Sequence, residues 1–70
     1  MLSARNQFQG TVLSVKSGGV MSEVVIRIAP NLEIVALIST SSAKRLKLRK
    51  GRPATAVIKA TEVIVSASGE

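Results

Sequence analysis

The chain has 70 residues, with ten Lys and Arg against four Asp and Glu, so its formal net charge is +6; it contains no Cys, no His and one aromatic residue. These absences exclude zinc fingers, iron–sulfur clusters, disulfide frameworks and imidazole-based catalytic sites. The four carboxylates lie far apart in the sequence, which argues against a two-carboxylate hydrolase or an oxygen-ligated metal site, so we predict a protein that is not an enzyme and needs no cofactor.

The length predicts one small domain over residues 1–70. The sequence contains no apolar stretch long enough for a membrane span and no signal peptide, so we expect a cytoplasmic protein that makes no membrane contact. A core this small rarely stabilises a domain by itself, and neither disulfides nor metal ligands are available here. Because 46% of the residues are apolar, we expect some of them to lie in subunit interfaces.

The first two predicted strands form a hairpin. The first covers residues 7–16 and contains Gly10, which indicates a β-bulge or a sharp coil that lets one strand serve two sheets of a small barrel. A Ser-Gly-Gly turn follows. The second strand covers residues 21–29, where Val24, Ile26 and Ile28 alternate with Glu23, Val25 and Arg27 up to the Pro-Asn turn.

Three further strands and one helix complete the prediction. Residues 33–38 form an almost continuous apolar strand, whose two faces would be covered by the barrel and a helix or by another subunit. The hydroxyls of residues 39–42 can cap a short helix over residues 42–46. The last strands are placed at residues 54–59 and 62–67. This order predicts an all-β, OB-like five-stranded Greek-key barrel with one short helix between strands 3 and 4; the competing SH3-like barrel would lack the helix.

Six of the ten cations lie within residues 44–52. This basic run suggests a nucleic-acid-binding module as the alternative function. However, OB-type barrels hold single strands by stacking bases on aromatic side chains, and Phe8 alone cannot form such a platform. A charge run on a helix and its exit loop is more often a solvated face or an ion-pair rim in an oligomer, so nucleic acid is not the partner that we predict.

Three short segments are suited to binding a small anion. Each combines hydroxyls, amides or cations at a predicted strand end or helix start, where backbone N–H groups lack partners. An ionised oxyanion only accepts hydrogen bonds, so its site requires such donors and no carboxylate. The segments are residues 3–6, 39–42 and 59–61. Ser/Thr clusters also cap helices and form turns, so this composition alone leaves both roles open.

The sequence resembles the molbindins, the small molybdate-binding (Mop) proteins. Residues 3–10, Ser-Ala-Arg-Asn-Gln-Phe-Gln-Gly, are similar to the SARNQ-x-x-G opening of that family. Further similarity covers the segments 22–24, 36–39 with Ser42, the turn ending at Gly51, and 57–63. Pro30 and Asn31 depart from the glycine-rich turn common in the family.

The resemblance implies a stand-alone molybdate-binding domain that assembles as a homohexamer, a trimer of dimers. Its function would be storage or homeostasis of molybdate or tungstate bound between subunits. Lys59 would supply charge and Arg5 its backbone amide. The implied oxyanion site consists of Ser3, Ala4, Arg5, Asn6, Lys59, Ala60 and Thr61 of one subunit, closed by Ser39 and Ser42 of another. Simpler roles are an interface ion pair for Arg5, a helix cap for Ser42 and a solvent-facing strand end for Lys59.

The resemblance also implies a second type of oxyanion site near a three-fold axis. Our candidate is the turn containing Val20, Met21 and Ser22, whose backbone amides could converge by symmetry. A plain hairpin turn is the alternative. Of the broader alternatives, a nucleic-acid module predicts salt-dependent affinity for DNA or RNA, whereas a purely structural oligomer predicts no ligand.

Overall fold

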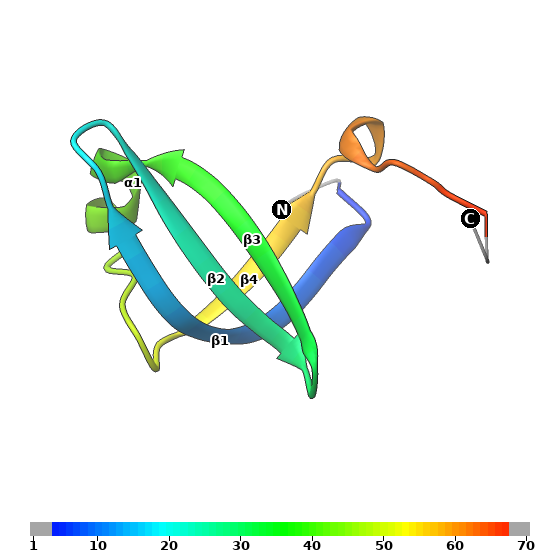
Figure 1. Ribbon diagram of the computed structural model, residues 1–70, viewed down its shortest axis with the longest axis horizontal. Helices are drawn as coiled ribbons and strands as arrows, with labels where there is room; N and C mark the ends of the chain where they lie inside the picture. Colours follow the sequence, from blue (N-terminus) through cyan, green and yellow to red (C-terminus); the bar gives the residue numbers. More distant parts are fainter. Residues whose placement is uncertain (1–3, 68–70) are drawn as a thin grey trace.

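A computed structural model of the chain describes residues 4–67 (Figure 1). The described part contains four strands, one α-helix and one 3-10 turn. In chain order these are β1 (Asn6–Ser17), β2 (Met21–Ala29), β3 (Leu32–Ser39), α1 (Thr40–Arg45), β4 (Pro53–Ile58) and η1 (Ala60–Glu62). The strands form one antiparallel sheet in the order β3-β2-β1-β4. The sheet curls into a half-barrel, with α1 at one end and both described chain ends at the other (Figure 1).

β1 is the strand that gives the sheet its curl. Its first half pairs with β4 from Asn6 to Thr11, and its second half pairs with β2 from Thr11 to Ser17. One strand therefore serves two sides of the barrel, as the sequence predicted. The β-bulge expected at Gly10 lies instead between Val12 and Ser14, where the register with β2 shifts.

Gly10 permits the sharp coil for a different reason. A β-carbon at this position would collide with the carbonyl oxygen of Arg27 and would lie 2.9 Å from its carbonyl carbon. The backbones of β1 and β2 cross so closely here that no side chain fits between them.

β2 and β3 follow the predicted alternation. Val24 and Ile26 are buried on the inner face of β2, whereas Glu23 and Arg27 are exposed. The turn to β3 contains Asn31 with φ 64°. Asn is among the few non-glycine residues that adopt this left-handed conformation readily, so the departure from a glycine-rich turn leaves the hairpin intact.

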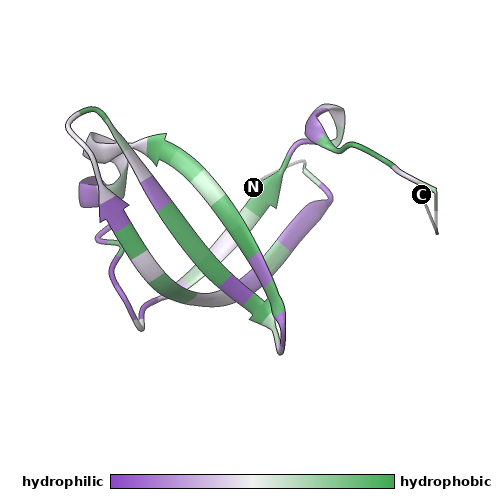
Figure 2. Cartoon of the chain, in the orientation of Figure 1, coloured by the Kyte–Doolittle hydropathy of each residue, from purple (hydrophilic) through white to green (hydrophobic). Residues whose placement is uncertain are grey.

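The core is small and aliphatic. Its buried members are Val12, Val24, Ile26 and Ala56, with Ile34, Ile38 and Leu48 among the residues packed around them. Figure 2 shows the apolar character of β2 and β3 along most of their length. On the outer face of β3, however, Val35 is 61% exposed and Leu37 is 69% exposed. The barrel and α1 therefore do not cover both faces of β3. Of the two coverings expected from the sequence, only another subunit would cover this outer face.

The helix and the last strand differ from the prediction. α1 begins at Thr40 rather than at residue 42, because Ser39 is its N-cap: the Ser39 side chain accepts a hydrogen bond from the Ser42 amide. The fifth strand predicted over residues 62–67 is wrong for this structure. Residue 62 ends η1, and residues 63–67 belong to no strand and lead away from the sheet (Figure 1).

The predicted OB-like, all-β fold is otherwise confirmed, including the helix between the third and fourth strands. An apolar segment forms a strand only where it meets a free sheet edge, and residues 63–67 do not meet one within their own chain. No helix in residues 4–67 is long and apolar enough to cross a membrane.

Candidate functional site

Two segments from opposite ends of the sequence meet at one end of the half-barrel. Asn6 pairs with Ile58, so the residues before β1 lie beside those after β4, as Figure 1 shows. Together they line a surface pocket of about 470 Å³. Its lining residues are Ala4, Arg5, Asn6, Lys59, Ala60 and Thr61. Ser3, also predicted for this site, lies outside the described residues. We call this pocket the terminal pocket.

The lining of the terminal pocket matches the requirements of an anion. It carries the cations Arg5 and Lys59 together with an amide and a hydroxyl side chain, and none of its described lining residues has a carboxylate. The nearest carboxylate in the sequence is that of Glu62, which follows Thr61 in η1 and does not line the pocket. The carbonyl oxygens of Ala4 and Arg5 accept hydrogen bonds from Gln7, from its side-chain Nε2 at 2.6 Å and from its backbone N at 3.1 Å. Both carbonyl oxygens, which as acceptors would repel an anion, therefore have hydrogen-bond donors from Gln7.

The other side of the terminal pocket begins the turn η1. Lys59 is its N-cap residue, and the first N–H groups of a helical turn have no partner inside the turn. Glu62 donates its backbone N–H to the Lys59 carbonyl at 2.9 Å, so the turn is closed immediately after the pocket. The pocket thus combines side-chain cations with backbone donors.

Ser39 and Ser42 lie elsewhere, at the start of α1. The Ser39 Oγ donates to the Ser42 Oγ at 2.8 Å and accepts from the Ser42 N at 3.1 Å. Both side chains are partly buried. The helix-cap role is therefore shown for Ser39, and Ser42 is the residue whose amide is capped.

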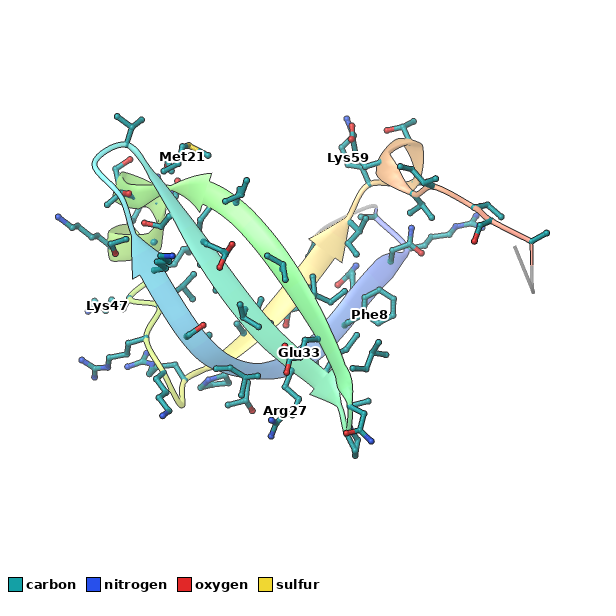
Figure 3. The ribbon with its side chains drawn as sticks, in the orientation of Figure 1. Phe8, Met21, Arg27, Glu33, Lys47 and Lys59 are labelled. Carbon is teal, nitrogen blue, oxygen red and sulfur yellow. The ribbon has the colours of Figure 1, made fainter. Side chains whose placement is uncertain are left out.

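The two groups of predicted site residues occupy opposite ends of the molecule. Ser39 pairs with Met21 beside the end of β1 at Ser17, whereas the terminal pocket adjoins the beginning of β1 at Asn6. Figure 3 shows the same separation between Met21 and Lys59. A single chain therefore does not bring Ser39 and Ser42 to the terminal pocket, and a site that contains both groups requires two chains.

The turn proposed for a second oxyanion site is tightly bonded. Ser22 is 1% exposed, and its hydroxyl forms a hydrogen bond with the Thr40 hydroxyl at 2.8 Å. Thr40 also donates its N–H to the Val20 carbonyl at 2.7 Å and its hydroxyl to the Gly18 carbonyl at 3.0 Å. The Val20 and Met21 side chains are exposed. Only backbone amides in this turn remain as candidate anion donors, and the second site stays a prediction.

Thr40 connects two parts of the fold, although the sequence gives it no distinction from the neighbouring Ser hydroxyls. It joins the β1–β2 turn to the start of α1 through three hydrogen bonds. Its partners are 18 to 22 residues away in the sequence, so no local pattern could have identified it.

The basic run lies on the last turn of α1 and on the loop to β4. Lys44, Lys47 and Arg49 border a pocket of about 270 Å³ whose floor includes Val15, Ala43 and Leu48. The single aromatic residue, Phe8, lies on the first half of β1, away from Lys47 (Figure 3). The structure therefore does not combine the basic run with an aromatic stacking surface. Residues 4–67 also contain no cluster of His, Cys, Asp or Glu that could hold a metal ion.

The Ser39 cap gives a testable prediction for stability. We expect Ser39→Ala to lower the free energy of unfolding by about 1 kcal/mol, because the Ser42 amide loses its acceptor. Urea unfolding followed by circular dichroism measures this change. Ser41→Ala is the matched control, since the Ser41 hydroxyl contacts the Ser39 hydroxyl at 3.3 Å but does not accept the hydrogen bond of the Ser42 amide. Equal losses in both variants would contradict the capping role.

Comparison with known proteins places this chain among small molybdenum-binding proteins. A family profile described as "TOBE domain" matches residues 2–65. Molybdenum-pterin-binding protein 1 of Clostridium pasteurianum is 42% identical over 66 residues, covering 94% of this chain and 97% of that protein. The molybdenum transport protein ModE of Herbaspirillum seropedicae is 46% identical over 63 residues, which are 90% of this chain but only 23% of ModE.

Solved structures agree with the sequence matches. MopII from Clostridium pasteurianum superposes with a TM-score of 0.90 at 42% identity, covering 96% of this chain and all of that chain. A molybdate-binding protein from Sporomusa ovata gives a TM-score of 0.89 at 36% identity and covers 96% and 98% of the two chains. With its OB-like fold and near full-length similarity to these relatives, the chain belongs to the TOBE-domain family of small molybdenum-pterin-binding (Mop) proteins.

Proposed function

We propose that this chain binds molybdate or tungstate between the subunits of a homohexamer, a trimer of dimers, and thereby stores or buffers the anion in the cytoplasm. The observation that carries the proposal is the terminal pocket, where two cations and several polar donors meet without a carboxylate among the described lining residues. The similar protein from Sporomusa ovata is described as a molybdate-binding protein. ModG, 39% identical over 91% of this chain but matched over only 45% of its own chain, is described as a cytoplasmic molybdate-binding protein.

Binding is electrostatic and involves no bond making or breaking. The tetrahedral dianion sheds water and accepts hydrogen bonds from the Lys59 ammonium, from the backbone amides near Arg5 and from the first amides of η1. Sulfate carries the same charge and shape in a smaller volume, so selectivity depends on the size of the pocket. Residues Ser3, Ala4, Asn6, Ala60 and Thr61 complete the proposed subunit surface.

The proposed site is shared because Ser39 and Ser42 cannot reach the terminal pocket of their own chain. A second chain that presents its α1 start to the pocket would add their hydroxyls to the Lys59 side. The exposed Val35 and Leu37 on the outer face of β3 support association. Covering these apolar side chains with another subunit removes apolar surface from water, which is favourable. Anion binding between subunits then stabilises the oligomer by mass action.

Native mass spectrometry with and without molybdate tests this function directly. We expect a hexamer that takes up several molybdate or tungstate ions per assembly, and little or no sulfate at the same concentration. Uptake of sulfate and molybdate to the same extent would indicate a non-specific attraction to the cationic surface. A monomer or dimer that binds no molybdate would overturn the proposal.

A further inference from the structure

A second pocket lies where the end of α1 faces the second half of β1, and we call it the basic pocket. Its volume is about 270 Å³, and none of the lining residues that the structure describes has a carboxylate. Three aliphatic residues form its floor and three cations border it: Val15, Ala43 and Leu48, and Lys44, Lys47 and Arg49. The basic pocket shares no lining residue with the terminal pocket.

The end of α1 brings two of these cations to the basic pocket. Leu48 donates its N–H to the Ala43 carbonyl at 3.1 Å, and Lys47 donates its N–H to the Lys44 carbonyl at 3.0 Å. These two bonds form the Schellman motif that ends many helices. They also provide donors for two carbonyl oxygens at the helix end, where unpaired acceptors would oppose an anion.

Lys47 occupies the position of this motif that favours glycine. Its φ is 56°, a left-handed conformation that is unfavourable for a residue with a β-carbon. Glycine would form the turn with less strain, so the backbone alone does not account for a lysine here. The Lys47 side chain lies beside the second half of β1 and borders the basic pocket (Figure 3). Strained residues of this kind concentrate at functional sites.

The loop that carries Arg49 is fixed to the core. Arg52 donates its N–H to the Arg49 carbonyl at 3.0 Å, with Gly51 at φ 89° between them, which closes a β-turn. Gly51 donates to the Val12 carbonyl at 2.8 Å, and Val12 donates to the Arg52 carbonyl at 2.9 Å. Val12 is buried in the core. Arg49 therefore lies on an anchored turn, which lowers the entropy lost on binding a ligand.

The chemistry of the basic pocket fits an anionic group joined to an apolar body. A phosphate monoester carries a charge of about −1.5 to −2 at pH 7 and three acceptor oxygens. Lysine ammonium groups and the planar arginine fork are the side chains that bind such groups. A bare anion would leave the aliphatic floor in contact with water, whereas a carbon skeleton would cover it. The Ser17 hydroxyl, which also lines the pocket, adds a neutral donor.

We propose that the basic pocket binds a small organic phosphate, a phosphate monoester whose carbon skeleton lies on the aliphatic floor. The phosphate oxygens accept hydrogen bonds from Lys44, Lys47 and Arg49, and no bond is made or broken. A volume of about 270 Å³ limits the ligand to a small molecule. This site goes beyond the proposed function and does not depend on molybdate binding.

The probe for this site is 1-naphthyl phosphate, whose fluorescence is easily followed because the chain contains no Trp and no Tyr. Fluorescence anisotropy of the probe, titrated with the full chain in a buffer without molybdate, measures the affinity. We expect saturable binding. Inorganic phosphate, added as a competitor, should bind at least about tenfold more weakly, because it covers none of the apolar floor. Equal affinities, or no saturable binding, would overturn the proposal.

Lys47→Gly separates the side chain from the fold. Glycine adopts the left-handed conformation readily, so we expect a melting temperature no lower than that of the parent chain. We expect the probe to bind about tenfold more weakly, because one charge-assisted hydrogen bond is lost. Lys44→Gln, on the exposed side of α1, repeats the test at a position with ordinary helical geometry. Full affinity in both folded variants would contradict the proposed site.

Lys50→Ala is the matched control, since it removes one positive charge from the same loop and Lys50 does not line the basic pocket. We expect less than about twofold change in affinity for the probe, which reflects only the weaker general attraction of anions. Losses as large as those of Lys47→Gly would show that the probe responds to net charge alone, and the proposal would be wrong.

Backbone amide chemical shifts of isotope-labelled protein locate the bound probe. We expect the largest changes at Ser17 and over residues 43–49. Changes centred on residues 59–61 would place the probe in the terminal pocket and overturn the proposal. None of these experiments contains molybdate, so their failure is distinguishable from a failure of the proposed molybdate site.

Discussion

Replacing Lys59 with alanine is expected to weaken molybdate binding by about 10- to 100-fold. A charge-assisted hydrogen bond contributes about 1.5–3 kcal/mol, and each 1.4 kcal/mol corresponds to a factor of ten in affinity. Lys59 lines the terminal pocket and lies next to the first amides of η1. Its ammonium would therefore supply positive charge close to a dianion bound in this pocket. Isothermal titration calorimetry with molybdate, performed on the assembled protein, measures the change.

The matched control for Lys59 is Lys50→Ala. Lys50 is exposed in the loop that carries the basic run, and it does not line the terminal pocket. Both substitutions remove one positive charge per chain, so they reduce general attraction of anions equally. We expect Lys50→Ala to change the affinity less than twofold. If the two variants lost affinity to the same extent, binding would depend on net charge and the assignment of the site to the terminal pocket would be wrong.

Among substitutions of the glycines that the structure describes by alanine, Gly10→Ala is expected to cause the largest loss of stability. The new β-carbon would collide with the Arg27 carbonyl oxygen and would also lie 2.9 Å from the Ile26 Cγ2. Backbone atoms cannot move aside as a flexible side chain can, so β1 and β2 must separate at their crossing. We expect a loss of about 3 kcal/mol, the upper part of the range for overpacking. For a domain of this size, that corresponds to a melting temperature lower by roughly 12 °C or more.

Gly19→Ala is the control for this experiment, because a β-carbon there meets nothing within 4 Å. Both variants should be compared at the same protein concentration, since association shifts the apparent melting temperature. Differential scanning calorimetry provides the measurement. A melting temperature for Gly10→Ala within a few degrees of that for Gly19→Ala would show that the strands have room at this crossing.

Local patterns in the sequence were sufficient for most of the sheet. The alternation of Val24 and Ile26 with charged neighbours indicates which residues lie on the inner face of β2, because successive side chains of a strand point to opposite faces. Pro30 and Asn31 mark a turn through their own backbone preferences. The importance of Gly10 was also visible in the sequence, although its role is close approach to Arg27 rather than a bulge. These properties are encoded within a few residues.

The predicted site residues could be grouped from the sequence only in part. The segments around Arg5 and Lys59 were recognised by their hydrogen-bond donors and by resemblance to a family. Their meeting in the terminal pocket depends on the pairing of Asn6 with Ile58, which joins positions 52 residues apart (58 − 6). The location of Ser39 at the opposite end of β1 follows from the order of strands in the sheet. A linear sequence contains no direct measure of either distance.

The segment over residues 63–67 shows most clearly what the sequence by itself determined and what only the tertiary structure decided. Its apolar, β-branched residues indicate a strand, and that preference is a property of the residues themselves. Whether a strand forms depends on a free sheet edge, since backbone N–H and C=O groups need partners from another segment. The tertiary structure leads residues 63–67 away from their own sheet (Figure 1), and Ile64 and Val65 are exposed. Local chemistry thus specified the kind of element, whereas the path of the folded chain decided which edge that element can join.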